Sequence, residues 1–300
     1  MDRKELKDYL DERRSEVDRV LQAYIPGPKC EPALLHEAIR YSLFAGGKRI
    51  RPILCLAAAE SVGGRREAAL PFAAAIELIH TYSLVHDDLP QMDDDTYRRG
   101  KLTNHKMFGE GAAILAGDAL LTAAFTMIAE NGLSGSISAR KVLSLILEIG
   151  SSAGAAGMVG GQWVDIQSQG KKGVDLEKLL YIHTHKTGAL IRASVRAGGI
   201  LGGGGPRKLS QLTQYGEKVG LAFQIADDIL DVEGEEGKMG KAVGQDRAKE
   251  KWTYPALVGV ERAKKEAGIL VEQALAAIKG FGPEADPLRA IAAYVVDRKN

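Results

Sequence analysis

The sequence predicts an all-α protein, a single-domain bundle of about ten or more helices. Three observations favour this fold class. Apolar residues recur every three or four positions along most of the chain, Ala and Leu are abundant in these segments, and alternating β-branched runs are nearly absent. No linker-like stretch divides the helical runs, so residues 1–300 are expected to form one domain with few strands or none.

Each helix is predicted from its own pattern. An apolar stripe runs from Leu6 to Leu21, and a second, from Leu34 to Phe44, stops at Gly46-Gly47, as helices commonly end at glycine. The other helices are predicted over residues 66–89, 111–131, 138–150, 175–199, 207–233, 252–279 and 287–297. Residues 112–129 and 212–230 are apolar on more than one face, which is typical of helices at the centre of a bundle.

Bulk composition excludes several classes of protein. Hydrophobic residues make up 45% and charged residues 26% of the chain, which argues against a disordered or fibrous protein. The 40 Lys and Arg residues balance 39 Asp and Glu residues, so the net charge of +1 indicates neither a nucleic-acid partner nor a membrane surface. Cys30 and Cys55 lack the spacing of a zinc site or a disulfide framework.

The sequence also favours a cytoplasmic location. Residues 1–14 are highly charged and do not resemble a signal peptide. The longest uncharged apolar stretch, Ala119–Ala129, is shorter than the roughly 20 residues that span a bilayer. We therefore expect no stable membrane insertion.

Two acidic clusters follow strongly apolar helical segments, HDDLPQMDDD at residues 86–95 and DDILD at 227–231. Asp227 and Asp231 lie four residues apart on one helical face, where like charges destabilise an isolated helix, so a positive group is expected between them. Magnesium is the economical candidate, because it binds one or two carboxylates together with phosphate oxygens. We expect the two helices to face each other across one cavity.

The first cluster carries a proline that shapes it. Pro90 removes a helix donor and bends the chain, so that Asp87 and Asp93 can converge on one metal ion although they are more than a helical turn apart.

Four basic patches flank the acidic clusters. They are residues 46–52, 98–101 and 185–188, and Lys238, Lys241, Lys249 and Lys251. Arg and Lys match phosphate oxygens, the first as a fork and the second as a point charge. Unit charges about 5 Å apart interact by about 3 kcal/mol at an effective dielectric near 20. A diphosphate facing several aspartates therefore requires divalent cations, and the joint pattern predicts a magnesium–polyphosphate site.

In their order along the chain, these motifs resemble those of the trans-isoprenyl diphosphate synthases, the head-to-tail prenyltransferases. They are GGKRIRP (46–52), HDDLPQMDDD (86–95), RRGKLTNH (98–105), GGQ (160–162), HKTGAL (185–190), FQIADDILD (223–231) and GKAVGQD (240–246). The resemblance covers about two-thirds of the chain. It implies the isoprenoid synthase fold, with helices around a deep central cavity, and a homodimer.

The resemblance also implies a role for individual residues. It gives two or three Mg²⁺ ions per site the ligands Asp87, Asp88, Asp93 and Asp227, with Asp228 and Asp231 nearby. It assigns isopentenyl diphosphate to Lys48, Arg51, His80 and Arg99. It assigns the allylic diphosphate to Arg98, Lys186, Thr187, Gln224, Lys241 and Lys251, with Lys186, Thr187 and Gln224 also as the catalytic residues.

The chemistry expected at such a site is charge stabilisation. Magnesium and basic side chains stabilise the departing diphosphate, the isopentenyl double bond attacks the allylic carbon, and a proton passes to the released diphosphate. The cavity below must be dry, because water would trap the cation. The apolar segment Ile76–Val85 is the expected wall.

The length of the product depends on what closes the cavity. Tyr82 lies five residues before Asp87, about 7–8 Å lower along a helix, where its ring could form the floor. An aromatic residue there, with the two extra residues Pro90-Gln91, resembles bacterial farnesyl diphosphate synthases of the geranyltranstransferase type. We therefore expect isopentenyl diphosphate to condense with dimethylallyl and geranyl diphosphate to give (2E,6E)-farnesyl diphosphate (C15). Ser83 is small, so a geranylgeranyl diphosphate (C20) product is the alternative.

Three other functions remain as alternatives. A class I terpene cyclase needs no second diphosphate pocket, so the basic residues Lys48, Arg51 and Arg99 argue against it. A non-catalytic subunit of a heteromeric prenyltransferase commonly loses aspartates from a metal motif, and this chain keeps both motifs. A plain metal- or phosphate-binding helical protein would show no magnesium-dependent turnover.

Overall fold

The computed structural model describes residues 1–135, 137–171, 173–233 and 252–297, and most of these residues are helical. The all-α prediction and the expectation of ten or more helices are confirmed. Strands β1 (Tyr97–Arg98) and β2 (Lys101–Leu102) pair antiparallel and form the only sheet within the described ranges.

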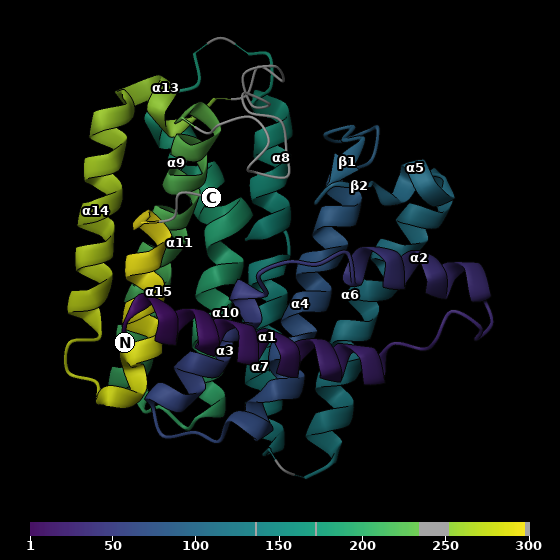
Figure 1. Ribbon diagram of the computed structural model, residues 1–300, viewed down its shortest axis with the longest axis horizontal. Helices are drawn as coiled ribbons and strands as arrows, with labels where there is room; N and C mark the ends of the chain where they lie inside the picture. The colour runs from purple at the N-terminus through teal and green to yellow at the C-terminus, as the bar shows by residue number, and fades with distance from the viewer. Residues whose placement is uncertain (136, 172, 234–251, 298–300) are drawn as a thin grey trace.

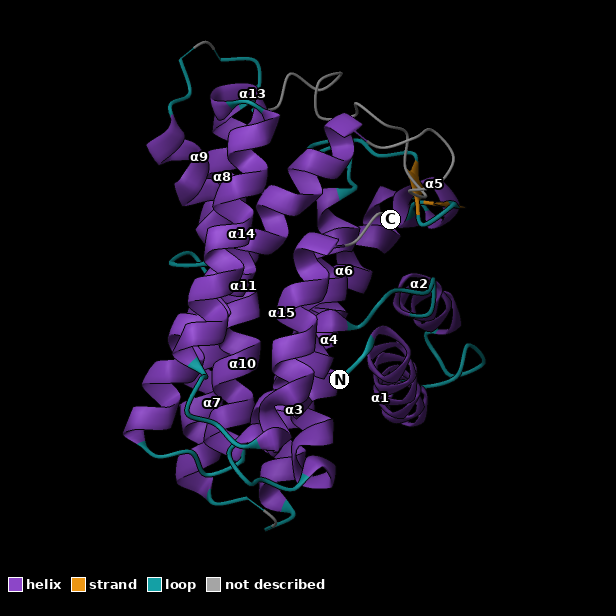
Figure 2. Ribbon diagram, turned by 60° about the vertical axis from the view of Figure 1, so that its left-hand side comes forward, coloured by secondary structure: helices purple, strands orange, loops and turns teal. Residues whose placement is uncertain are grey.

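The longer helices stand upright in a bundle, and two helices cross it. Figures 1 and 2 show α1 and α2 lying across the upright helices, with β1, β2 and α13 at the upper end. In chain order the helices are α1 Arg3–Tyr24, α2 Ala33–Leu43, α3 Ile50–Ser61, α4 Arg66–Asp87, α5 Asn104–Phe108, α6 Glu110–Leu133, α7 Ala139–Ala153, α8 Met158–Ser168, α9 Leu176–Ile182, the π-helix η1 His183–Gly188, α10 Ala189–Leu201, α11 Pro206–Glu233, α13 Tyr254–Val258, α14 Val260–Ala277, the 3₁₀-helix η2 Pro283–Ala285 and α15 Asp286–Asp297.

Two apolar clusters fill the bundle. The first joins α4 and α6 with α1, α2 and α7, and Phe72 is among its fully buried side chains. The second joins α11, α14 and α15, where the Tyr215 hydroxyl donates to the Leu288 carbonyl oxygen at 2.6 Å. Helices α3 and α10 pack closely between them, since a Cβ at Gly198 would lie 2.0 Å from the Cys55 carbonyl oxygen. Burial also raises the pKa of the Cys55 thiol to about 12.

Most predicted helix bounds agree with the structure. Helices α4, α6, α7, α11 and α15 match their predicted ranges to within three residues. The predicted helix over 175–199 is instead three segments, α9, η1 and α10, and the one over 252–279 is broken at Gly259, whose φ is +84°. Helices α3, α5 and α8 and the 3₁₀-helix η2 were not predicted.

Three helical segments are long and apolar enough to cross a membrane by length and composition alone. They are Arg66–Asp87, Glu110–Leu133 and Ala139–Ser168. The apolar window of the first is 67% buried inside the protein, so α4 is an internal helix. The window of α6 is only 39% buried, which leaves a broad apolar face on the surface.

Candidate functional site

Helix α4 ends at the first acidic cluster, and the chain then folds back on itself. The Asp93 N–H donates to the Asp87 carbonyl oxygen at 2.9 Å, and the Asp94 N–H donates to Leu89 at 3.0 Å. Pro90 lies exposed in this turn. The bend brings the backbones of Asp87 and Asp93 together, in agreement with the sequence argument.

Lys186 connects η1 to this cluster. Its ammonium lies 2.6 Å from Asp165 Oδ2 of α8. Burial alone would lower the pKa of Lys186, but Asp165 and then Asp87 and Asp93 raise it above its usual value. Gln169 at the end of α8 donates to Asp93 Oδ1 at 3.3 Å. The acidic turn, α8 and η1 therefore meet around one cation.

The other side of η1 reaches the second acidic cluster on α11. The Thr187 hydroxyl donates to Gln224 Oε1 at 2.8 Å, and Gln224 Nε2 donates to Asp228 Oδ1 at 3.0 Å. Asp228 Oδ2 accepts the Tyr254 N–H at 2.8 Å and lies 3.3 Å from His183 Nε2. Asp228 is 4% exposed. It holds α11, η1 and α13 together around a cavity of about 90 Å³.

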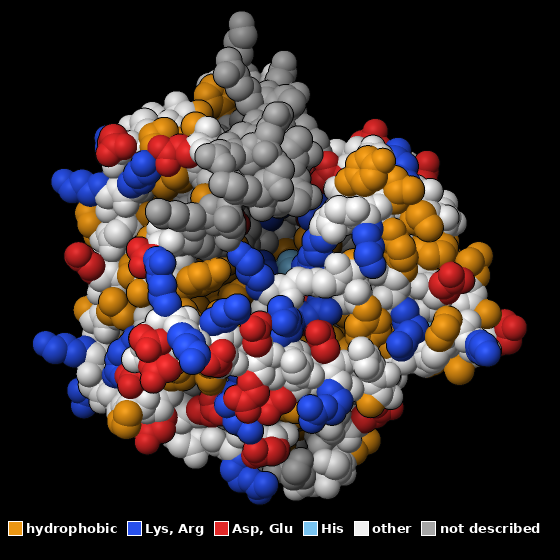
Figure 3. Space-filling view, in the orientation of Figure 1, with side chains coloured by type: hydrophobic (Ala, Val, Ile, Leu, Met, Phe, Trp, Pro, Cys, Tyr) orange, Lys and Arg blue, Asp and Glu red, His pale blue; other side chains and the backbone are white. Residues whose placement is uncertain are grey.

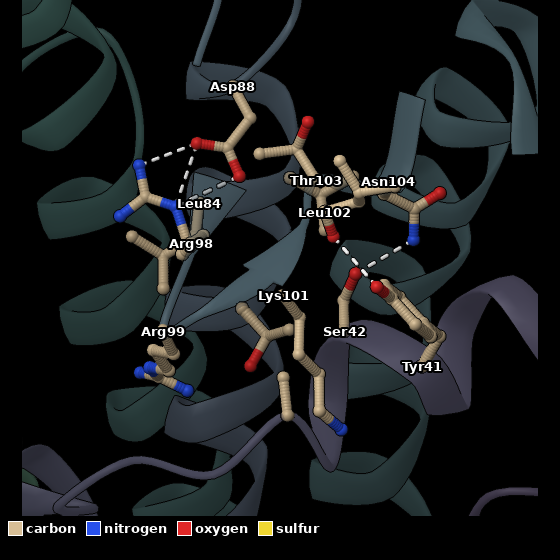
Figure 4. Close-up of a pocket in the computed structure, with 13 residues that line it drawn as sticks. Tyr41, Ser42, Leu84, Asp88, Arg98, Arg99, Lys101, Leu102, Thr103 and Asn104 are labelled. Carbon is tan, nitrogen blue, oxygen red and sulfur yellow. Dashed lines mark hydrogen bonds and ion pairs between the residues drawn. The ribbon is translucent and has the colours of Figure 1, made fainter. Parts of the chain in front are cut away.

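Asp88 in the first acidic cluster, like Asp228 in the second, is buried and binds a side chain of a neighbouring segment, here Arg98 (Figure 4). Its carboxylate accepts from Arg98 Nε at 2.7 Å and lies 2.6 Å from Arg98 Nη2, and it is 3% exposed. Arg98 also lies 3.4 Å from Asp95. These acidic neighbours raise the pKa of Arg98 although burial opposes them. Asp88 thus fixes Arg98 beside the acidic turn.

A basic cluster lies between α3, α4 and the β1–β2 hairpin. Arg51 Nη1 is 3.3 Å from His80 Nε2, and Arg99 donates to the Gly46 carbonyl oxygen. Burial, followed by Arg51 and Arg99, holds the pKa of His80 well below its usual value. Burial also lowers the pKa of Arg51 and Arg99. Such a cluster of desolvated cations is suited to a highly charged anion.

Lys48 is exposed at the edge of this basic cluster, and its ammonium lies 5.9 Å from the centre of the Tyr294 ring. In the space-filling view of this face, Lys and Arg side chains gather around a central hollow (Figure 3). The four residues expected to bind isopentenyl diphosphate therefore come from one region of the structure.

Arg49, in the same GGKRIRP motif as Lys48 and Arg51, binds other parts of the protein. Its guanidinium donates to Glu77 at 2.8 Å, Asp18 at 2.9 Å and the Leu43 carbonyl oxygen at 2.6 Å, and the residue is 3% exposed. Its φ of 51° is left-handed, which is uncommon for arginine. Arg49 anchors the loop from which Lys48 and Arg51 extend.

Tyr82, the predicted cavity floor, lies near the end of α4 and contacts His86. The prediction uses only the helical rise of 1.5 Å per residue. A separation of five residues also rotates the Tyr82 side chain by about 140° around the helix axis relative to Asp87. The Tyr82 ring packs edge to face on His86 at 5.7 Å, and His86 Nε2 lies 3.0 Å from the Ile114 carbonyl oxygen of α6. The Tyr82 ring therefore lies beside His86, which contacts α6, whereas helical spacing places Ser83 and His80 on the line below Asp87. The role of Tyr82 as the cavity floor stays a prediction.

The carboxylates fit a magnesium site shared with a diphosphate. Within the described ranges, no group of three or more His, Cys, Asp or Glu side chains could hold a metal ion alone. Asp87 and Asp93 nevertheless both lie within electrostatic reach of Lys186. One or two carboxylates completed by phosphate oxygens and water are the ligands magnesium commonly takes. Lys241 and Lys251, expected at the allylic diphosphate, lie outside the described residues.

Comparison with known proteins adds the following similarities. A family model described as polyprenyl synthetase matches residues 32–286. A geranylgeranyl diphosphate synthase of Cyanophora paradoxa is 49% identical over 97% of this chain and 96% of its own. A chloroplastic geranylgeranyl pyrophosphate synthase of Capsicum annuum is 46% identical over 98% of this chain and 79% of its own. The apo crystal structure of an FPP/GFPP synthase from Zymomonas mobilis has a TM-score of 0.88 at 39% identity, covering 97% of this chain and 99% of that chain.

These similarities confirm the expected fold and correct the expected product. The expectation of farnesyl diphosphate is wrong, because the curated relatives are mostly named as geranylgeranyl synthases. They favour the C20 alternative.

Proposed function

The chain belongs to the polyprenyl synthetase family of prenyltransferases. We propose that it condenses isopentenyl diphosphate with allylic diphosphates to give geranylgeranyl diphosphate (C20) and diphosphate. The observation that carries the proposal is the pairing of two separate cationic regions with one acidic turn. One region is the basic cluster around Arg51 and His80, and the other is η1 with Lys186.

The acidic side of the site would receive the allylic diphosphate. Asp87, Asp93 and Asp227 would hold magnesium, which when bound supplies Lewis-acid stabilisation of the departing diphosphate. Lys186 and Arg98 bring positive charge to the same leaving group, and Asp165 and Asp88 hold these two cations in place. Because the donors are fixed before substrate arrives, little reorganisation accompanies the charge that develops.

The basic cluster would receive isopentenyl diphosphate. Lys48, Arg51, His80 and Arg99 would bind its diphosphate, so that its double bond points toward the allylic carbon between the two regions. As the allylic C1–O bond breaks, the electron pair leaves with diphosphate, and the isopentenyl double bond supplies the pair of the new C–C bond. The proton then lost from the isopentenyl C2 passes to the released diphosphate.

Two observations support the longer product. The curated relatives above are named as geranylgeranyl synthases. In addition, the small Ser83 lies on the face of α4 below Asp87, and its hydroxyl is turned to the His80 carbonyl oxygen at 2.8 Å. A growing chain would therefore pass α4 on a face without an aromatic side chain at that level.

A product assay with three primers tests the proposal. The purified protein is incubated with magnesium, isopentenyl diphosphate and either dimethylallyl, geranyl or farnesyl diphosphate, and the dephosphorylated alcohols are identified by mass. All three primers are expected to give geranylgeraniol, and EDTA is expected to abolish turnover. Accumulation of farnesol with farnesyl diphosphate left unused would contradict the C20 product. No condensation with any primer would indicate a non-catalytic subunit instead.

We also propose that the protein is a homodimer that buries the exposed face of α6. Leu115 on this face is 56% exposed, and Leu143 on α7 is 67% exposed. A groove of about 690 Å³ lies between α6 on one side and the end of α1 and helix α2 on the other. Thr122 and Thr126 on the same face carry hydroxyls, and Asp118 adds a charge. Polar groups of this kind suit a second protein chain better than lipid.

A further inference from the structure

Gln162 in α8 is a buried amide without a partner. The residue is 7% exposed, and neither its Oε1 nor its Nε2 has a hydrogen-bond partner within the part of the chain that the structure describes. Buried polar side chains are nearly always paired, because an unpaired amide is costly to remove from water. The GGQ motif containing Gln162 has no role in the site described above. An unpaired interior amide of this kind indicates a place where a ligand group completes it.

The neighbours of Gln162 along α8 show which way it faces. Met158, Gln162, Asp165 and Gln169 lie within about 60° of arc on one side of the helix. Met158 belongs to the apolar cluster that includes Tyr82, Asp165 contacts Lys186, and Gln169 contacts Asp93. This side of α8 thus changes from apolar at its start to anion-binding at its end. Gln162 lies between, about 4.5 Å below Asp165 along the axis.

The position of α8 is fixed tightly at this level. A Cβ on Gly161 would lie 2.1 Å from the backbone nitrogen of Lys186, so α8 and η1 are in direct backbone contact beside Gln162. The amide is therefore held at a constant height relative to Lys186 and Thr187. This level is the boundary between the diphosphate end of the site and its apolar end.

We propose that Gln162 is a further catalytic residue of prenyl transfer, whose amide faces the allylic C1–O bond. The inference rests on the proposed function. As that bond breaks, negative charge grows on the diphosphate above and positive charge grows on the allylic carbons below. An amide with its N–H groups toward the diphosphate and its oxygen toward the carbons has the dipole that stabilises this separation. Gln162 forms no covalent bond and gives up no proton.

Replacing the amide separates its catalytic from its structural effect. Gln162→Met keeps the length of the side chain and removes the unpaired polar atoms, so its melting temperature is expected to equal or exceed that of the wild type. Its kcat is expected to fall about 100-fold, the effect of removing one donor that stabilises developing charge. The KM for isopentenyl diphosphate is expected to stay within about twofold, since that substrate binds elsewhere. Gln167→Met, at an exposed position of the same helix, is the control and is expected to change nothing.

Two results with Gln162→Met would overturn the inference. An unchanged kcat would show that the amide does not meet the reacting bond, and a joint fall of kcat and melting temperature would show a structural role. If the wild type and Gln167→Met also fail to condense any substrate, the proposed function itself falls. If they are active, the result bears on Gln162 alone.

A second variant keeps the shape in case the Met variant does not fold. Gln162→Glu is expected to raise the KM for the allylic diphosphate as pH rises and the carboxyl ionises beside the diphosphate. An allylic KM with the same pH profile as the wild type would also overturn the inference.

Discussion

The second aspartate of each acidic motif, Asp88 and Asp228, fixes neighbouring parts of the chain at the site. Both side chains are buried, and each holds a neighbouring element in place, the first through Arg98 and the second through Gln224 and the Tyr254 backbone. Adjacent residues on a helix point about 100° apart, so the two side chains of an Asp-Asp pair take different roles. The sequence shows the pair, but the rotation of the helix that assigns the two roles comes from tertiary packing.

His80 provides a pH-dependent signature of the basic cluster. Burial and then the surrounding arginines hold its folded pKa well below 6.5, whereas in the unfolded chain the pKa returns to about 6.5. Between these two values the unfolded chain binds a proton that the folded protein does not, so the free energy of unfolding decreases as pH falls below about 6.5. Above pH 6.5 both forms are neutral and this contribution is constant.

Urea unfolding of the wild type and of His80→Gln at pH 7.5, 6.5 and 5.5 measures this contribution. The wild type is expected to lose more stability than the variant over the acidic interval, by at most about 1.4 kcal/mol per pH unit for one proton. Parallel stability profiles for the two proteins would show that His80 is not the group responsible.

At the scale of helices, α3 and α8 are two that sequence patterns do not reveal, and each is hidden for a distinct reason. Residues Pro52–Ala59 of α3 are all buried, so the helix has no polar face and hence no amphipathic period. Helix α8 contains Gly160-Gly161, which is more typical of a break than of a helix interior. A Cβ at Gly160 would lie 2.0 Å from the Ala155 carbonyl oxygen, so the close packing that explains the glycine is visible only in the fold.

The π-helix η1 is likewise a product of packing. The sequence over 175–199 has a continuous helical pattern, yet residues His183–Gly188 widen into a π turn. Such turns are rare and often lie at functional sites. Here the turn presents Lys186 toward α8 and Thr187 toward α11.

The contact between α8 and η1 can be tested directly. Gly161→Ala would place a methyl group 2.1 Å from the Lys186 nitrogen and force η1 away from α8. Overpacking of this kind costs about 1–3 kcal/mol of stability, and kcat/KM for the allylic substrate is expected to fall with it. Gly268→Ala in α14, where nothing lies within 4 Å, is the matched control and is expected to gain about 0.4–1 kcal/mol. Chemical denaturation together with steady-state kinetics measures both quantities, and equal behaviour of the two variants would contradict the contact.

On the scale of the molecule, the Asp-Asp-…-Asp form that the two acidic clusters share predicts that their helices face each other across one cavity. Helices α4 and α11 both end at the upper end of the bundle, and η1 links them through Lys186 and Gln224 (Figure 1). The product length could not be obtained in the same way. It depends on which side chains line the cavity at each level, and the rise along α4 alone does not fix where the Tyr82 ring lies around the helix.

The homodimer proposal predicts a change of mass on substitution at the α6 face. Leu115→Arg puts a charge on the surface that would be buried between the two chains, so the variant is expected to elute with the mass of one chain, 32.2 kDa. Light scattering after size exclusion measures this. Val296→Arg on α15, 38% exposed, is the control and is expected to keep the wild-type mass. A dimer that persists in Leu115→Arg would exclude this face.

The separation of the two cationic regions has a consequence for elongation. Under the proposed reaction, the diphosphate of each new product is the one that entered with isopentenyl diphosphate, so every round ends with the lengthened molecule held at Arg51 and His80. To react again, that molecule must transfer its head group across the site to Lys186 and the acidic turn. The final chain length is then set by the rate of this transfer relative to the rate at which the product dissociates. A substitution that weakens diphosphate binding at Arg51 would therefore shorten the average product without any change in the depth of the cavity.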